Sequence, residues 1–317
     1  MKQDNILIIG AGAIGAFYGA LLDKAGARVA VTCRSDYDVV KQHGFQIDST
    51  PLGNWTFRPS KVLKKPADYH RAADYVILCT KITDQTDRVA LLRDAVSPST
   101  TIVFIQNGID IEQEIVDAFP DNKIVSGLAF ICCNRIQPGV IKHLAYGKLT
   151  LGNLPSGISP ETQHLVDLFS RSRIEAVAMD DIITGRWIKS VWNAPFNPLS
   201  VLSGGLATAD ILSTQEAFIR DIMQEVCHIA AACGHPLPAD IIDINIENTR
   251  KMPPYKTSML LDFEQGRPME TEAILGNIVR AAAKQNLASP NLKALYALMQ
   301  LRQLSVSKSC HCSAIQP

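Results

Sequence analysis

The sequence has no excess of charge of either sign. Lys and Arg number 31 and Asp and Glu number 31, so the 317 residues carry a net charge of zero. Proteins that bind nucleic acid or an anionic membrane over a broad surface usually carry a basic excess. The overall charge therefore argues against both kinds of partner, although it does not exclude a local basic patch.

The sequence also lacks the pattern of a secretion signal, and we expect a cytoplasmic protein. Residues 6–22 are uncharged, but they lie at the short end of the spanning range and have a glycine-rich centre. A buried strand, a turn and a buried helix explain this run better than a membrane span.

The eight cysteines include no Cys-x-x-Cys pair. Most of them lie in apolar surroundings, which predicts buried, reduced thiols. The cluster Cys310-His311-Cys312 fits no common zinc spacing, and we predict no metal site there.

Strand and helix patterns alternate through the first half of the chain. Apolar or β-branched runs at 75–79 and 101–105 are typical of strands buried on both faces of a parallel sheet. Helical patterns at 84–96 and 111–119 follow them. The alternation predicts an α/β domain with a doubly wound parallel sheet over residues 1–178.

From about residue 180 onward, strands become hard to find. Helical patterns separated by proline and glycine occupy 181–194, 209–233, 238–251, 269–285 and 292–304. They predict a second, all-α domain over residues 179–317, with a loosely ordered tail from about 305. Pro195 should kink or end the first of these helices.

A glycine-rich motif lies between the first predicted strand and the first predicted helix. It reads Gly10, Ala11, Gly12, Ala13, Ile14 and Gly15. In this context G-x-G-x-x-G is the dinucleotide-binding fingerprint of a Rossmann-type domain. The first glycine permits the tight turn, the second lets the backbone approach a pyrophosphate, and the third lets the helix pack close to the strand.

The end of the second strand, at 28–33, indicates which dinucleotide fits. A carboxylate there would bind the ribose hydroxyls of NAD, whereas this chain has Arg34, whose guanidinium can grip a 2′-phosphate. We therefore predict NADP(H). Use of NAD remains an alternative because of Asp36, since a small shift of the loop would bring its carboxylate to the ribose.

Polar residues also follow two later strands, at the edge where such a sheet binds its ligands. Lys81 follows the run at 75–79, and Asn107 follows the run at 101–105. Each one alone is more often a solvated loop residue. Together they are candidate neighbours of the cofactor or of a negatively charged substrate.

The most informative part of the helical half is a polar stripe of Lys189, Asn193 and Asn197. A spacing of four places them on one helix face, next to apolar residues that are expected to be buried. Buried polar groups need partners, which a ligand could supply. A lysine reaching water, with two asparagines bonded to backbone, is the alternative, and for the stripe alone it is the commoner case.

Together, the glycine motif, Arg34, Lys81, Asn107-Gly108 and the Lys189 stripe resemble the ketopantoate reductase (2-dehydropantoate 2-reductase) family. The stretches 257–260 and 270–277 are similar to its second active-site segment. The resemblance covers residues 6 to about 304. It implies a Rossmann-type domain, a helical domain like that of 6-phosphogluconate dehydrogenase, an active site between them, and NADPH-dependent reduction of 2-dehydropantoate to (R)-pantoate in pantothenate and coenzyme A synthesis.

The resemblance also implies residue roles. Lys189 takes the place of the catalytic lysine, and Asn193 and Asn197 take the places of the substrate-orienting asparagines. Ser258 stands where a serine holds the substrate carboxylate. Glu270 stands at the glutamate near the lysine and the nicotinamide ribose, and Cys133 is counted among the expected cofactor contacts. Lys189 should act as general acid, since an ammonium can protonate the oxygen that gains charge on hydride addition.

Two departures lie in the expected substrate pocket: Ala207, where the family can have an asparagine, and the residues preceding Ser258. They leave other small 2-keto acids open as substrates. A different two-domain dehydrogenase and a non-catalytic NADP-sensing module also remain open, as does a homodimer.

Overall fold

The structure is a computed structural model that describes residues 3–84, 86–252 and 255–313; for residues 306–313 it describes the backbone alone. The chain divides into two compact units. The N-terminal unit comprises Met1–Gln106 and Glu112–Ile182, and the helical unit comprises Asn107–Ile111 and Ile183–Pro317. The predicted boundary at 178/179 differs because Gly157 N–H still donates to the carbonyl of Asp180 at 2.8 Å.

The N-terminal unit is built on a ten-stranded sheet. Its strands are β1 (Asn5–Ile9), β2 (Arg28–Thr32), β3 (Phe45–Ser49), β4 (Gly53–Phe57), β5 (Lys61–Leu63), β6 (Tyr75–Leu78), β7 (Thr101–Ile105), β8 (Ile124–Gln137), β9 (Val140–Asn153) and β10 (Ala176–Ala178). Its helices are α1 (Ala13–Lys24), α2 (Tyr37–His43), η1 (Pro66–Asp68), α3 (Arg88–Arg93), α4 (Gln113–Ala118) and α5 (Pro160–Ser170).

The strand order is β4-β3-β9-β8-β7-β6-β1-β2-β5, and β10 pairs with β9. The run from β8 to β5 is parallel throughout, while β9 is antiparallel to β8, and β4 is antiparallel to β3. Strands β1, β2 and β5 lie side by side, whereas β3 and β4, which come between β2 and β5 in the sequence, lie beyond β9 at the opposite end of the sheet. The chain then returns to β6 on the other side of β1. This reversal is the switch point of a doubly wound sheet, where ligands bind at the carboxyl ends of the strands.

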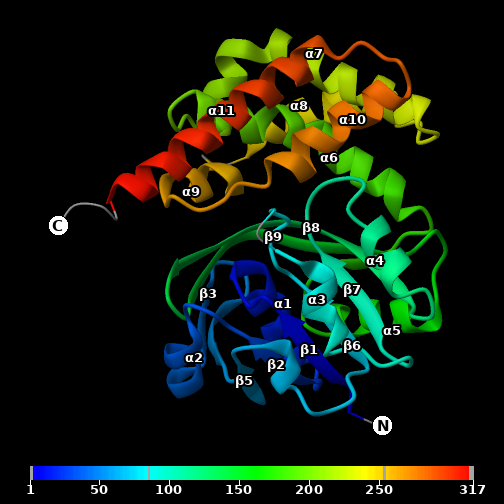
Figure 1. Cartoon of the computed structure of the whole chain (residues 1–317), viewed down its shortest axis with the longest axis vertical. Helices are drawn as coiled ribbons and strands as arrows, with labels where there is room; N and C mark the ends of the chain where they lie inside the picture. The colour runs from blue at the N-terminus through cyan, green and yellow to red at the C-terminus, as the bar shows by residue number, and fades with distance from the viewer. Residues whose placement is uncertain (1–2, 85, 253–254, 314–317) are drawn as a thin grey trace. The chain divides into compact units, whose positions relative to one another are not determined.

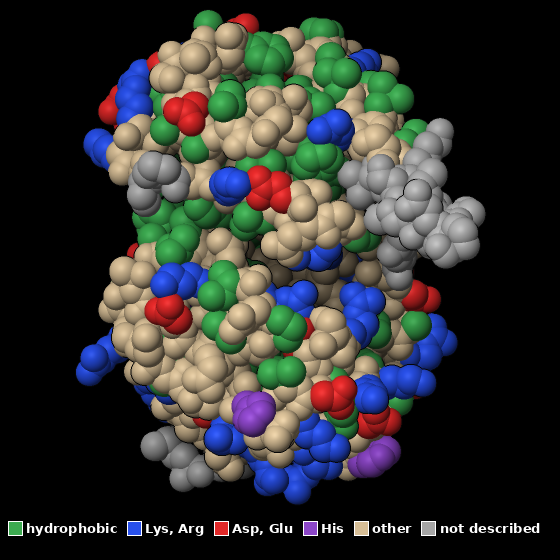
Figure 2. Space-filling view, turned by 90° about the vertical axis from the view of Figure 1, so that its left-hand side faces the viewer, with side chains coloured by type: hydrophobic (Ala, Val, Ile, Leu, Met, Phe, Trp, Pro, Cys, Tyr) green, Lys and Arg blue, Asp and Glu red, His purple; other side chains and the backbone are tan. Residues whose placement is uncertain are grey.

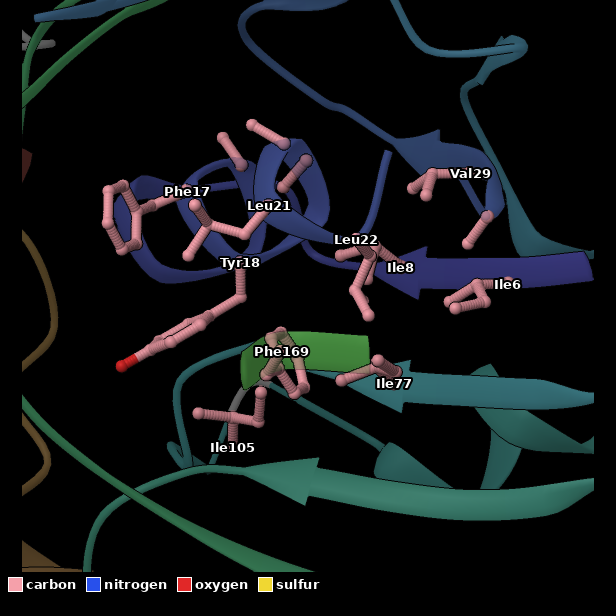
Figure 3. Packing of buried hydrophobic residues seen from close by; sticks show 14 of the residues in the cluster. Ile6, Ile8, Phe17, Tyr18, Leu21, Leu22, Val29, Ile77, Ile105 and Phe169 are labelled. Carbon is pink, nitrogen blue, oxygen red and sulfur yellow. The ribbon is translucent and has the colours of Figure 1, made fainter. Parts of the chain in front are cut away.

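Helices cover both faces of this sheet because its strands are apolar on both faces (Figure 1). In β1, Ile6 and Ile8 pack with residues of α1 and α5, whereas Leu7 and Ile9 pack on the opposite face with residues of α3 and α4. Figure 3 shows Leu22 of α1 lying close to Ile8 of β1. The alternation follows from the pleat of the strand.

The regular secondary structure of the helical unit is helical throughout the residues that the structure describes. The helices are α6 (Ile182–Leu202), α7 (Thr208–Ala232), α8 (Ile241–Lys251), α9 (Ser258–Glu264), the π-helical turn η2 (Glu272–Gly276), α10 (Asn277–Lys284) and α11 (Pro290–Ser313). The predicted fold class is therefore confirmed. Helix α11 continues to Ser313, through most of the segment expected to be loose, and the Cys310-His311-Cys312 side chains lie outside the described part of the chain.

Pro195 was expected to kink or end the first helix of this unit, and the predicted end at residue 194 is wrong. Helix α6 continues to Leu202 with Pro195 and Pro198 inside it. A proline removes one backbone hydrogen bond from a helix. Burial of an apolar face offsets that loss here, because Val191, Phe196 and Val201 are fully buried.

Basic, acidic and hydrophobic side chains are mixed over most of the surface shown in Figure 2, and several Lys and Arg side chains gather at its lower end. Among the described residues, every helix is too short or too polar to cross a membrane.

Candidate active site

The glycine motif forms the turn between β1 and α1 in the N-terminal unit. Gly10 has φ +89°, and a Cβ there would lie 2.9 Å from the backbone nitrogen of Thr80. A Cβ at Gly15 would lie 2.5 Å from the carbonyl oxygen of Gly10. At Gly12 nothing lies within 4 Å of an added Cβ. Gly10 and Gly15 are thus required by packing, whereas Gly12 borders open space.

That open space lies at the start of α1. Gly12 is the N-cap residue and supplies no side-chain cap, and the first turn of α1 contains no acidic residue. The first N–H groups of an α-helix have no partner within the helix and carry partial positive charge. The turn and the helix start therefore form a suitable site for a pyrophosphate.

Neighbouring strand ends complete this edge of the N-terminal unit. The side-chain amide of Gln106, after β7, donates to the carbonyl oxygen of Thr80 at 2.5 Å. Lys81 follows Thr80 and is half-buried. Cys133 on β8 donates from Sγ to the carbonyl oxygen of Ala13 at 3.7 Å, and burial raises the pKa of its thiol. A neutral Cys133 thiol thus lies against the first turn of α1.

Arg34 and Asp36, the two residues that could determine the preference for NADP or NAD, lie in different environments. Arg34 follows β2 and is exposed, and its guanidinium has no hydrogen-bond partner among the described residues. The side chain of Asp36 is 3 % exposed and ion-paired with Arg135. The loop therefore presents a cation to solvent and keeps its carboxylate inside the protein.

The predicted catalytic lysine lies on α6 of the helical unit. Lys189 is half-buried, and its Nζ donates to Oδ1 of Asn107 at 2.7 Å. Burial and the nearby Arg186 guanidinium lower the pKa of Lys189 to about 8, while the Glu270 carboxylate acts in the opposite direction. The lysine can therefore give up a proton near neutral pH.

Asn193 and Asn197 continue the stripe along the same helix. They are 7 % and 2 % exposed. Within the described part of the chain, neither side-chain amide has a hydrogen-bond partner. Buried amides are normally bonded, so this pair is suited to a polar ligand.

The segment Asn107–Ile111 leaves β7 and belongs to the helical unit. Arg186 donates from Nη1 to the Gly108 carbonyl at 2.9 Å. Asn277 donates to the Ile109 carbonyl at 2.6 Å, and Ile109 N–H donates to the Ala273 carbonyl in η2 at 3.3 Å. These bonds hold the backbone of the segment that carries Asn107. They thereby fix the position of the Asn107 oxygen that accepts the hydrogen bond from Lys189.

Arg186 is the functional candidate that the sequence reasoning missed. It is 1 % exposed and lies one helical turn before Lys189. Its place in the predicted helix 181–194, three residues before Lys189, was the only available signal, and it does not by itself reveal burial.

Ser258 is the first residue of α9 and is exposed. The preceding residue, Thr257, caps α9 by accepting from Leu260 N–H at 3.2 Å. Its Oγ1 is 2.6 Å from Oγ of Ser200, which donates to the Asn197 carbonyl at 2.8 Å. This chain of bonds ties the start of α9 to the Asn197 end of the stripe.

Comparison with known proteins identifies the family. A family model described as ketopantoate reductase PanE/ApbA matches residues 6–156, and its C-terminal counterpart matches residues 181–303. A 2-dehydropantoate 2-reductase from Nostoc sp. is 33% identical over 302 residues, covering 93% of this chain and 94% of the relative. The chain belongs to the ketopantoate reductase family. It is accordingly an oxidoreductase of a nicotinamide-dependent family.

Solved structures agree with membership of the ketopantoate reductase family. A 2-dehydropantoate 2-reductase from Methylococcus capsulatus is 57% identical with a TM-score of 0.90, and the match covers 96% of this chain and 98% of that one. A D-mandelate dehydrogenase solved with NADH and anilino(oxo)acetate is 24% identical with a TM-score of 0.85, covering 96% of this chain and 99% of that one. At that identity the likeness shows the fold alone.

Proposed function

We propose that this reductase converts 2-dehydropantoate to (R)-pantoate with NADPH, a step of pantothenate and coenzyme A synthesis. Relatives that carry the 2-dehydropantoate 2-reductase name, at 33% and 57% identity, support the substrate. The observation that carries the proposal is the stripe on α6, where a half-buried lysine precedes two buried amides that lack partners among the described residues. Such a set suits a small keto acid, which has several oxygen acceptors.

In this proposal Lys189 is the general acid. The nicotinamide supplies the hydride when the cofactor is bound. Addition of hydride to a carbonyl carbon leaves negative charge on the oxygen, which an ammonium stabilises and then protonates. Asn107 holds Nζ through the 2.7 Å bond, and Glu270 favours the charged form of the amine. Asn193, Asn197 and Ser258 orient the substrate.

The N-terminal unit holds the dinucleotide in this proposal. The open space at Gly12 and the start of α1 accept the pyrophosphate. Arg34 binds the 2′-phosphate, which selects NADPH. Lys81 and Cys133 flank the cofactor from the neighbouring strand ends. Asn107 and Glu270, also expected as cofactor contacts, belong to the helical unit together with Lys189.

The direct test is NADPH oxidation at 340 nm with a panel of keto acids: 2-dehydropantoate, 2-keto-isovalerate, 2-keto-isocaproate and pyruvate. We expect kcat/KM for 2-dehydropantoate to exceed that of each of the others by roughly tenfold or more, because only this substrate has a hydroxyl with which the buried amides can form hydrogen bonds. A higher value for another keto acid would instead assign a different substrate. NADPH binding without oxidation of any kind would favour a sensing module.

A further inference from the structure

Asp36 occupies an unusual position at the start of α2. It is the N-cap residue, where an aspartate normally accepts from its own helix, yet its side chain makes no cap bond. Its Oδ2 accepts instead from Gly139 N–H at 3.0 Å, at the tip of the β8–β9 hairpin. Its Oδ1 accepts from Arg135 of β8, which is 99 positions away in the sequence. Both oxygens are therefore used by the hairpin.

Arg135 is the residue that holds this carboxylate. Its Nη1 also donates to Oγ of Ser35 at 2.8 Å, and Ser35 Oγ donates to Oδ1 of Asp36 at 2.8 Å. The side chain of Arg135 is 31% exposed, whereas that of Asp36 is 3% exposed. The strand pairing shifts register between Arg135 and Gln137, and such a bulge redirects side chains. A partly exposed cation thus covers a buried anion.

The consequence concerns the loop that follows β2. A free carboxylate in this loop would bind the ribose hydroxyls of NAD and repel a 2′-phosphate. Paired and buried, Asp36 can do neither. Arg34 and Ser35, directly before it, are both exposed. The charge that the loop offers to a nucleotide is therefore set by whether Arg135 is present.

We propose that Arg135 is a specificity-determining residue of this reductase, because it withdraws the Asp36 carboxylate from the adenosine-ribose subsite and so permits binding of a 2′-phosphate. This inference rests on the proposed use of NADPH. It assigns the preference to the pair of Arg135 and Asp36 as well as to Arg34.

The test measures binding of adenosine 2′,5′-bisphosphate and of 5′-AMP to the full chain by titration calorimetry. Arg135→Gln should weaken the bisphosphate by roughly tenfold or more, because the uncovered carboxylate repels the phosphate, and should leave 5′-AMP within about threefold. The double variant Asp36→Asn/Arg135→Gln should recover most of the lost affinity. Arg34→Ala should weaken the bisphosphate whether or not Asp36 is present.

Equal loss of both ligands in Arg135→Gln, or no recovery in the double variant, would overturn the inference. If Arg135→Gln does not fold, Arg135→Lys replaces it: a lysine keeps the charge but not the paired N–H groups. The ratio of the bisphosphate affinity to the 5′-AMP affinity should then fall, and an unchanged ratio contradicts the proposal. Neither ligand contains a keto acid, so these results stand apart from failure of the proposed turnover.

Discussion

Lys189 donates its hydrogen bond to Asn107, a residue 82 positions earlier in the chain, over 2.7 Å. Asn107 is the second residue after strand β7 of the parallel sheet, but its segment belongs to the helical unit. The bond gives one N–H of the ammonium a fixed acceptor and so orients the amine. The proton donor is thus held by a loop and a helix that the chain order keeps far apart.

Replacing Lys189 with alanine should lower kcat by roughly 10²–10⁴-fold, because the general acid is lost. NADPH affinity should stay within about twofold of the unchanged protein. Steady-state kinetics and a fluorescence titration measure the two effects. Lys293→Ala, which removes an exposed lysine of α11, is the matched control and should change neither. Turnover that survives in Lys189→Ala within about tenfold would contradict the catalytic role.

The rate of reduction should fall as the pH rises through about 8. Burial and Arg186 lower the pKa of Lys189 to about 8, and only the protonated amine can act as the acid. The reverse reaction, oxidation of pantoate with NADP, needs the neutral amine and should speed up over the same pH range. Profiles of kcat/KM in both directions measure this. Two profiles that slope the same way would exclude Lys189 as the titrating group.

Arg186→Met should move the alkaline limb of the reduction profile to higher pH. The variant removes a cation that lowers the pKa of Lys189, and it removes the donor to the Gly108 carbonyl that anchors the Asn107 segment. A lower kcat should accompany the shift, because a loosened Asn107 orients the ammonium less well. Arg186→Lys keeps the charge and should keep the limb closer to its original position. A limb that stays in place in Arg186→Met would show that Arg186 has only a packing role.

Alanine substitutions at Gly12 and Gly15 should affect different properties: the first should lower cofactor affinity, and the second should lower stability. Gly12→Ala adds a methyl group in open space, so thermal stability should be preserved while NADPH affinity falls by roughly tenfold or more, since the backbone can no longer approach the pyrophosphate. Gly15→Ala places a methyl group 2.5 Å from a backbone carbonyl, and we expect a loss of about 1–3 kcal/mol of stability. Thermal unfolding and NADPH titration check both variants. Unchanged affinity in Gly12→Ala would mean that the phosphates lie elsewhere.

Local patterns were sufficient for much of the fold. The apolar runs at β6 and β7 predicted buried parallel strands, because strands covered on both faces need no polar alternation. The short strands β3, β4 and β5 were not predicted. Strand β3 pairs with β9, β4 pairs with β3, and β5 pairs with β2. β3 and β5 thus add to the sheet through partners that are not their neighbours in the sequence. Helix α6 was cut short at Pro195, because a local rule on proline cannot include the packing that keeps the helix intact.

The amino-acid sequence by itself determined the doubly wound sheet, the glycine turn and the order of the polar stripe, because strand burial, positive φ and helical spacing are properties of neighbouring residues. Only the tertiary structure decided which charges meet. It brought Asn107 to Lys189, buried Arg186 beside them, and paired Asp36 with Arg135 rather than leaving its carboxylate free. Those contacts join residues that are far apart in the chain, and their energies depend on burial and distance, which folding alone supplies.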